Sequence, residues 1–194
     1  VYAMLQHLNK ISKNIVTVED PVEYQFDIIN QVQVNSKAGV TFASILRNIL
    51  RQDPDIIMVG EVRDKETAAI ATRAALTGHL VISTIHTNDS ISTITRLADM
   101  GIVPYLVSSS LLGVLSQRLI RKLCENCKKP TKLTSEEVEL LRSQKITEET
   151  EVFQPVGCDQ CLKSGFKGRQ AIFEFLVPDN RIRQLISQGA SEMD

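Results

Sequence analysis

Residues 51–64 read RQDPDIIMVGEVRD, and this stretch decides the fold class. Its apolar run, residues 56–60, is typical of a strand that is buried on both faces, as the inner strands of a parallel sheet are. Glu61 follows directly, where that strand must end. A buried carboxylate is costly unless a partner stabilises its charge. Glu61 is therefore predicted either to return to water or to face a cation or a transferable proton.

The rest of the chain alternates between strand-like and helix-like patterns. Apolar, β-branched runs predict strands at 15–18 and 80–84, and an alternating run predicts a half-exposed strand at 30–34. Helices are predicted to about residue 10, after a Thr41 cap, over 65–77 after an Asp64 cap, and over 90–99 and 104–118. This alternation predicts an α/β fold with a mainly parallel sheet flanked by helices.

The overall composition excludes some classes of protein. The 194 residues include 22 basic and 23 acidic side chains, and a net charge of −1 argues against a protein that mainly neutralises a nucleic-acid backbone. No apolar run approaches the ~20 residues of a membrane-spanning helix. The longest, around 102–115, is interrupted by Pro104, serines and Gly113.

The character of the sequence changes beyond Leu119. Residues 118–133 hold six basic side chains and one acid, residues 134–151 hold six acids and two bases, and all four cysteines lie beyond residue 119. We therefore predict a core of residues 1–118 and a smaller C-terminal region of residues 119–194. Within that region the pattern predicts a helix around 135–143, a strand at 170–176 and a helix at 180–188.

Reactive side chains follow three of the predicted strands. They are Glu19, Asp20 and Glu23 after the first, Glu61 after the second, and His86 after the third. The carboxyl ends of parallel strands lie at one edge of a sheet, which is where ligands bind in open α/β sheets. The alternative is that these residues are polar only because loops are polar.

Acids, a histidine and arginines at one edge fit phosphoryl transfer to water. This reaction needs a carboxylate to orient or deprotonate the water, acids to hold Mg²⁺ through its hydration shell, and cations to stabilise the phosphoryl group. A metallohydrolase is the competing interpretation. His79 and His86, however, lie at opposite ends of one predicted strand, which is poor spacing for ligands of one metal. A purely structural role also stays open for each histidine.

The cysteines form two C-x₂-C pairs, Cys124 with Cys127 and Cys158 with Cys161, separated by 30 residues. Four thiolates at ~2.3 Å from the ion can close a tetrahedral Zn²⁺ site. The alternatives are two disulfides or four unrelated thiols. Basic side chains around both pairs form either a solvated face or a surface for an acidic partner.

Three motifs resemble those of one family of motor proteins. The stretch LRQDPDIIMVGEVRD (50–64) resembles the signature of the secretion and pilus-assembly ATPases, the motors of type II secretion and type IV pilus extension. IVTVEDPVEY (15–24) is similar to their acidic Asp box, and TGHLVISTIHTN (77–88) is similar to their His box. The similarity runs nearly end to end, in the family's order.

The resemblance implies a RecA-like P-loop NTPase core with a small zinc-binding C-terminal region. It implies ATP, Mg²⁺ and Zn²⁺ as cofactors, and a homohexameric ring with nucleotide between subunits. It assigns Glu61 as the catalytic glutamate of an atypical Walker B motif, in which Gly60 replaces the usual metal-binding Asp. The other implied site residues are Glu19, Asp20 and Glu23 for the Mg²⁺ and water network, His79 and His86 for the γ-phosphate, and Arg47, Arg51 and Arg63 for charge stabilisation or subunit contacts.

The family carries a phosphate-binding loop, G-x-x-x-x-G-K-[ST], ahead of the helix with which this chain begins. That loop is absent from the sequence. We therefore expect the chain to be the C-terminal portion of a motor and, alone, to turn over ATP negligibly. The tetracysteine motif is typical of the family's secretion branch rather than its retraction branch.

The leading hypothesis is thus a motor ATPase that couples ATP hydrolysis to pilin or pseudopilin assembly. The implied partners are an inner-membrane platform protein and cytoplasmic assembly proteins, with the motor in the cytoplasm and at the inner membrane only through them. Two alternatives stay open. One is a non-catalytic interaction domain of the same fold. The other is a zinc-stapled nucleic-acid-binding module, against which the charge balance and the 5% aromatic content argue.

Overall fold

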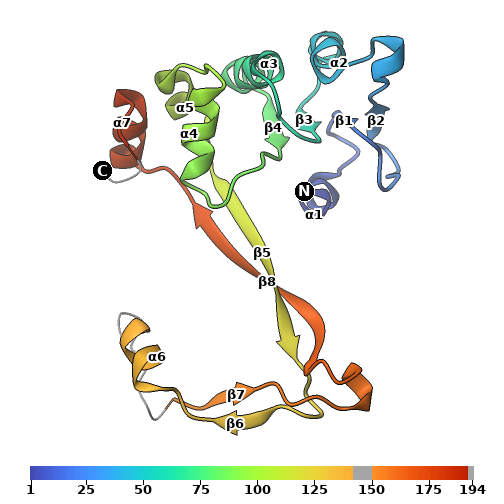
Figure 1. The fold of residues 1–194 in the computed structure, drawn as a ribbon. Coiled ribbons are helices and arrows are strands. Elements are labelled where there is room, and N and C mark those ends of the chain that lie inside the picture. The colour runs from blue at the N-terminus through green and yellow to red at the C-terminus, as the bar shows by residue number, and fades with distance from the viewer. Residues whose placement is uncertain (142–149, 192–194) are drawn as a thin grey trace. The chain divides into compact units, whose positions relative to one another are not determined.

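The computed structural model describes residues 1–141 and 150–191. It contains two compact units. Residues 1–116 and 174–194 form one, here called the core unit, and residues 117–173 form the other, the cysteine unit. Two long strands, β5 (Val114–Leu123) and β8 (Phe166–Leu176), pair with each other, and each has residues in both units (Figure 1).

The remaining helices and strands fall within one unit or the other. The core unit contains α1 (Tyr2–Leu8), β1 (Ile15–Glu19), β2 (Asn30–Gln33), the 3₁₀ turn η1 (Ser36–Ala38), α2 (Phe42–Ile49), β3 (Ile56–Val59), α3 (Lys65–Leu76), β4 (Leu80–Ser83), α4 (Ser92–Asp99), α5 (Pro104–Ser110) and α7 (Asn180–Gln188). The cysteine unit contains β6 (Lys129–Thr131), α6 (Ser135–Leu140), β7 (Val152–Gln154) and the 3₁₀ turn η3 (Asp159–Cys161).

The core unit is built on a four-stranded sheet in the order β2-β1-β3-β4. All three neighbouring pairs are parallel, with Ile15 opposite Ile56 and Ile56 opposite Leu80. The predicted parallel α/β fold is therefore confirmed. The predicted strand after residue 55 ends at Val59, one residue earlier than expected.

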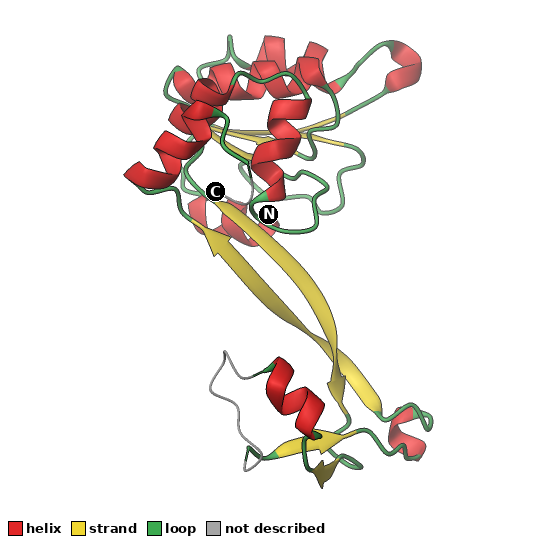
Figure 2. Ribbon diagram, turned by 60° about the vertical axis from the view of Figure 1, so that its left-hand side comes forward, coloured by secondary structure: helices red, strands yellow, loops and turns green. Residues whose placement is uncertain are grey.

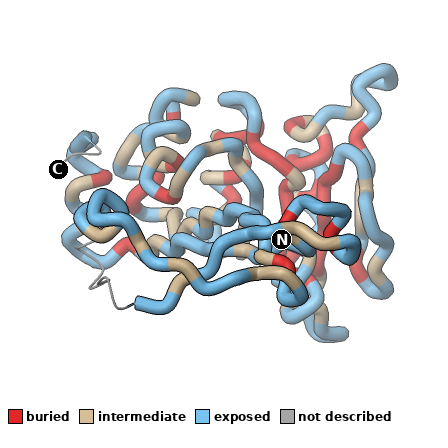
Figure 3. Tube along the Cα trace, turned by 60° about the horizontal axis from the view of Figure 1, so that its bottom comes forward, coloured by how far each residue is buried: buried red, intermediate tan, exposed pale blue. Residues whose placement is uncertain are grey.

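Both faces of this sheet are covered, which explains the unbroken apolar runs of its inner strands. Alternate residues enter two clusters: Val18 and Val59 pack in one with side chains of α2, α3, α5 and α7, and Met58 packs in the other with Leu5 of α1. Every residue of β1 and β3 is buried. Figure 2 shows helices packed around the sheet, and Figure 3 shows where buried residues occur along the chain. Helices on both faces leave the strand ends as the accessible parts of the sheet.

Side-chain caps define where the two helices next to β3 begin. The Thr41 hydroxyl accepts a hydrogen bond from the Ser44 N–H, and the Ser44 hydroxyl accepts one from the Thr41 N–H, which completes a capping box before α2. Asp64 accepts bonds of 2.8 Å from both the N–H and the hydroxyl of Thr67 in the first turn of α3. Both predicted caps are confirmed.

Replacing Asp64 by alanine is expected to destabilise the core unit by about 1 kcal/mol, because the first turn of α3 loses its acceptor. For a protein of this size that corresponds to a fall in Tm of roughly 2–4 °C, measured by circular dichroism. The neighbouring Lys65→Ala variant, which leaves the cap intact, is the control. Equal Tm values for the Asp64→Ala variant and the unmodified chain would contradict the assignment.

The predicted helix over 104–118 is wrong in its second half. α5 ends at Ser110, and β5 begins at Val114. Gly113 lies so close to β8 that a Cβ built on it would be 3.2 Å from the Leu176 carbonyl oxygen. Residues 114–118 therefore form a strand because they pair with β8, some sixty residues later in the chain. A local helical pattern carries no information about so distant a partner.

The C-terminal helix belongs with the core unit rather than with the cysteine unit. α7 brings Ile182 and Ile186 to the main core cluster. Its Arg183 guanidinium donates to the carbonyl oxygens of Ser108 and Leu111 at the end of α5, the second at 3.0 Å. Residues 119–194 therefore do not form one compact unit, because the chain returns to the core along β8.

The cysteine unit has little regular structure. β6 and β7 pair antiparallel, and α6 begins with a capping box between Thr134 and Glu137. The helix predicted around 135–143 ends at Leu140, and the last residues of that range lie outside the described residues. Within residues 1–141 and 150–191, no helix has the length and apolar character needed to cross a bilayer.

Candidate active site and cysteine cluster

The carboxyl edge of the core sheet carries two of the predicted acids. Glu19 is the last residue of β1, and Glu61 comes two residues after the end of the adjacent strand β3. His86 follows β4, the next strand along the sheet. Because the strands are parallel, these three side chains come from the same edge, as the sequence predicts.

Glu61 is buried, with 9% of its surface exposed, and it faces a cation. The Arg63 guanidinium donates to Oε2 of Glu61, and Nε2 of His86 lies 3.2 Å from the same oxygen. The Arg63 and His86 side chains are themselves 67% and 81% exposed. Of the two environments predicted for Glu61, the structure thus shows the second: its carboxylate lies at the carboxyl edge of the sheet, beside a guanidinium and an imidazole.

Gly60 allows β1 and the start of this turn to approach closely. Its N–H donates to the Val18 carbonyl oxygen at 2.7 Å. A Cβ at Gly60 would lie 3.1 Å from that oxygen and 3.4 Å from Cα of Glu19. A larger residue would therefore push apart the two acid-bearing strand ends.

Glu19 is more deeply buried, with 2% of its surface exposed. Its Oε1 accepts hydrogen bonds from the Thr17 hydroxyl at 2.6 Å and the Gln31 amide at 3.0 Å, and its Oε2 accepts one from the Tyr2 hydroxyl. The sequence analysis did not identify these three donors. Of the three, only Thr17 could have been identified from the sequence, because residues two apart in a strand lie on the same face.

The other predicted acids and arginines are exposed. Asp20 and Glu23 lie in the segment between β1 and β2. Arg47 on α2 forms an ion pair with Glu66 on α3, and Arg51 lies exposed just beyond α2. Arg63 is the one of the three predicted arginines that contacts Glu61 in the described part of the chain.

His79 does not join this group. It precedes β4 and therefore lies at the opposite, amino edge of the sheet from Glu61. Its Nδ1 is 3.0 Å from the Ala74 carbonyl oxygen and 3.3 Å from the Thr77 hydroxyl, at the end of α3. There it lines a cavity of about 540 Å³ together with Lys13 and Asp55. The described contacts of the His79 side chain are thus with the C-terminal end of α3.

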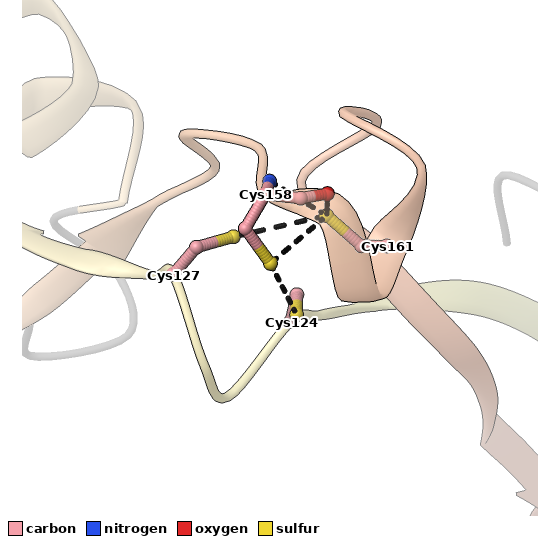
Figure 4. A group of neighbouring side chains, drawn as sticks. All are labelled: Cys124, Cys127, Cys158 and Cys161. Atoms are coloured by element: carbon pink, nitrogen blue, oxygen red, sulfur yellow. Dashed lines mark hydrogen bonds between the residues drawn. The ribbon is translucent and has the colours of Figure 1, made fainter.

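The four cysteines converge in the cysteine unit (Figure 4). Cys124 and Cys127 come from the turn after β5, Cys158 is the N-cap of η3, and Cys161 is the last residue of η3. Their sulfur atoms all lie within 4.8 Å of one another. The Sγ–Sγ distances are 3.9 Å for Cys124–Cys158 and 3.8 Å for both Cys127–Cys161 and Cys158–Cys161. None of the four forms a disulfide. A tetrahedron with Zn–S bonds of ~2.3 Å has edges of about 3.8 Å, so this donor set fits zinc.

Backbone N–H groups point at the sulfur atoms. Those of Cys158 and Gly165 donate to Cys161 at 3.2 and 3.3 Å, and that of Gly157 donates to Cys127 at 3.3 Å. The bonds to Cys161 lower its pKa to about 6, led by the bond from Cys158, whereas burial raises the pKa of Cys127 to about 11. The Cys161 thiol is thus ionised more readily than an ordinary cysteine, as suits a metal ligand.

Two of the basic side chains near the cysteines are paired locally. Lys128 lies 2.6 Å from Glu125, and Lys163 lies 2.7 Å from Asp159. Arg121 stacks over the Phe166 ring at 3.9 Å. Local pairing and stacking therefore use part of the positive charge that the sequence concentrates here.

The chain is similar to proteins of one family along its whole length. A family model described as Type II/IV secretion system protein matches residues 1–194. The type II secretion system protein E of Aeromonas hydrophila is 51% identical over 193 residues, which cover 100% of this chain and 38% of that protein. The type IV pilus assembly ATPase PilB of Thermus thermophilus is 52% identical over 191 residues, covering 98% of this chain and 22% of that protein.

Solved structures agree with this similarity. The pilus retraction motor PilT with bound ADP superposes with a TM-score of 0.69 at 34% identity, covering 97% of this chain and 46% of that one. The ATPase DotB of Legionella pneumophila gives a TM-score of 0.64 at 25% identity, covering 94% and 42%. The chain spans 38% or less of the two curated relatives named above. With a family model matched over every residue, this chain belongs to the type II/IV secretion system protein family.

Proposed function

We propose that this chain is part of a hexameric motor ATPase that couples ATP hydrolysis to pilin or pseudopilin assembly, in type II secretion or type IV pilus extension. The observation that carries the proposal is the position of Glu61. It is a buried carboxylate at the carboxyl edge of a parallel sheet, in contact with Arg63 and His86. This arrangement suits a group that orients or deprotonates a water molecule.

The neighbouring residues have complementary proposed roles. Arg63 and His86 hold the Glu61 carboxylate through Oε2, which directs Oε1 toward the attacking water. The exposed carboxylates of Asp20 and Glu23 would hold Mg²⁺ through its water shell. When bound, Mg²⁺ neutralises phosphate charge. We assign the response to the γ-phosphate to His86, and subunit contacts to Arg47 and Arg51.

The cysteine cluster is proposed to hold one structural Zn²⁺. Four thiol ligands leave no open position for a substrate, as in structural rather than catalytic zinc sites. The cluster also favours a motor for secretion or pilus extension over one for retraction. We propose that the hexamer works in the cytoplasm and reaches the inner membrane through a platform protein and cytoplasmic assembly proteins.

Steady-state phosphate release in the presence of Mg²⁺ tests this function. We expect negligible turnover by the 194-residue chain alone, because no phosphate-binding loop is present in its sequence. We expect turnover of about 1 s⁻¹ or more in the full-length motor, within the usual range for enzymes. Turnover by the chain alone would show that other groups bind the phosphates. No turnover by the hexameric full-length protein would favour a non-catalytic interaction domain.

A further inference from the structure

The Glu19 carboxylate is held entirely by uncharged donors in the described part of the chain. Two of them belong to the sheet: Thr17 is on β1 itself, and Gln31 lies directly opposite Thr17 on β2. The sheet therefore fixes both donors to Oε1. A buried carboxylate in such a site depends on its hydrogen bonds for stabilisation of its charge.

Tyr2 differs from these two donors because it comes from a helix. It lies on α1, and its hydroxyl donates to Oε2 of Glu19. The same hydroxyl oxygen accepts a hydrogen bond of 3.2 Å from the Glu23 N–H. One phenol thus joins the buried acid to the backbone of the segment that carries Asp20 and Glu23.

The ring of Tyr2 is fixed as well as its hydroxyl. It packs edge-on against Tyr24 and Phe26, with ring centroids 5.7 and 5.4 Å apart. Burial and the hydrogen bond to Glu19 raise the pKa of Tyr2 above its ordinary value of 10.0, so the phenol stays protonated near neutral pH. It is therefore a donor to Glu19 under the conditions in which the motor would work.

The backbone of Glu19 lies beside the turn that carries Glu61. Its Cα would lie 3.4 Å from a Cβ on Gly60, the residue before Glu61. We propose that Tyr2 is a positioning residue, whose hydroxyl holds Glu19 in one orientation and ties the segment bearing Asp20 and Glu23 to the edge that carries Glu61. This inference rests on the proposed function for its effect on turnover, but the contacts themselves can be tested without it.

The test is Tyr2→Phe, which keeps the aromatic ring and removes only the hydroxyl. Tyr24→Phe is the matched control, since it removes a nearby phenol that is 69% exposed. In the 194-residue chain, we expect the Glu23 amide to exchange with solvent about tenfold faster in Tyr2→Phe, because it loses its acceptor. In the full-length motor, we expect kcat to fall roughly tenfold with KM for ATP within about twofold, the pattern of a contact that matters in the transition state.

Each outcome decides the proposal. Unchanged Glu23 exchange together with unchanged kcat in an active motor would overturn it, as would equal effects of Tyr24→Phe. If Tyr2→Phe does not fold, 3-fluorotyrosine at position 2 replaces it. A fluorine NMR titration must then give a phenol pKa above that of free 3-fluorotyrosine, because of burial and the hydrogen bond to Glu19, and an unshifted pKa would overturn the proposal. A full-length motor without ATPase activity would refute the proposed function, whereas Glu23 exchange would still decide whether Tyr2 holds this segment.

Discussion

Replacing Glu61 by glutamine is expected to lower the kcat of the full-length motor by about 10²–10⁴-fold, the range for removal of a positioned acid–base group. Glutamine has nearly the same shape, but its amide cannot take a proton from water. The substitution also removes the negative charge that Arg63 and His86 contact in the unmodified protein. ATP binding should change little, because the expected defect lies in the chemical step. Phosphate release and fluorescent-nucleotide binding, measured on the same preparation, separate the two.

Glu136→Gln is the matched control for this experiment. Glu136 is exposed in the first turn of α6, in the cysteine unit, and the same change of charge there should leave kcat within about twofold. A Glu61→Gln motor that retains kcat within about threefold would contradict the catalytic assignment. It would leave Glu61 as a structural partner of Arg63.

Replacing Cys161 by serine is expected to abolish zinc binding and unfold the cysteine unit. Cys161 is buried, lies 3.8 Å from two other cysteine sulfur atoms and accepts two backbone N–H bonds. Structural zinc sites contribute on the order of 10 kcal/mol to the folding of small domains. Without its zinc, the cysteine unit has too few buried apolar residues in its described part to stay folded. We expect one zinc per chain by mass spectrometry before the change and none after it.

Gln160→Ser is the control, because it places serine in the same C-x₂-C pair at an exposed position that supplies no thiol. It should keep one zinc per chain. Hydrogen exchange should show that β1 and β3 stay protected in Cys161→Ser, because their apolar cores lie in the core unit. Full zinc content in Cys161→Ser would refute the role of Cys161 as a required ligand, and disulfides recovered from the native protein would refute the zinc site.

The sequence by itself determined the buried inner strand and the starts of two helices, because these depend on residues that are neighbours in the chain. The apolar run at 56–59 predicts a strand buried on both faces, and Asp64 and Thr41 predict the starts of α3 and α2. The spacing of the two C-x₂-C pairs predicts a four-thiol cluster. For the strand and the caps the physical cause lies within a few residues, so it is visible in the sequence. The spacing within each C-x₂-C pair is also local, although the two pairs that meet are 34 residues apart.

The tertiary structure alone decided which of these residues meet. It places His86 beside Glu61, which is 25 residues away, and it places His79 against the Ala74 carbonyl oxygen of α3. It brings Tyr2 and Gln31 to Glu19, from 17 and 12 residues away. It also ends α5 before β5, and it packs α7 on the core. These outcomes depend on the free energy of pairing and packing between segments that are far apart in the sequence, and a local pattern does not reveal which segments will meet.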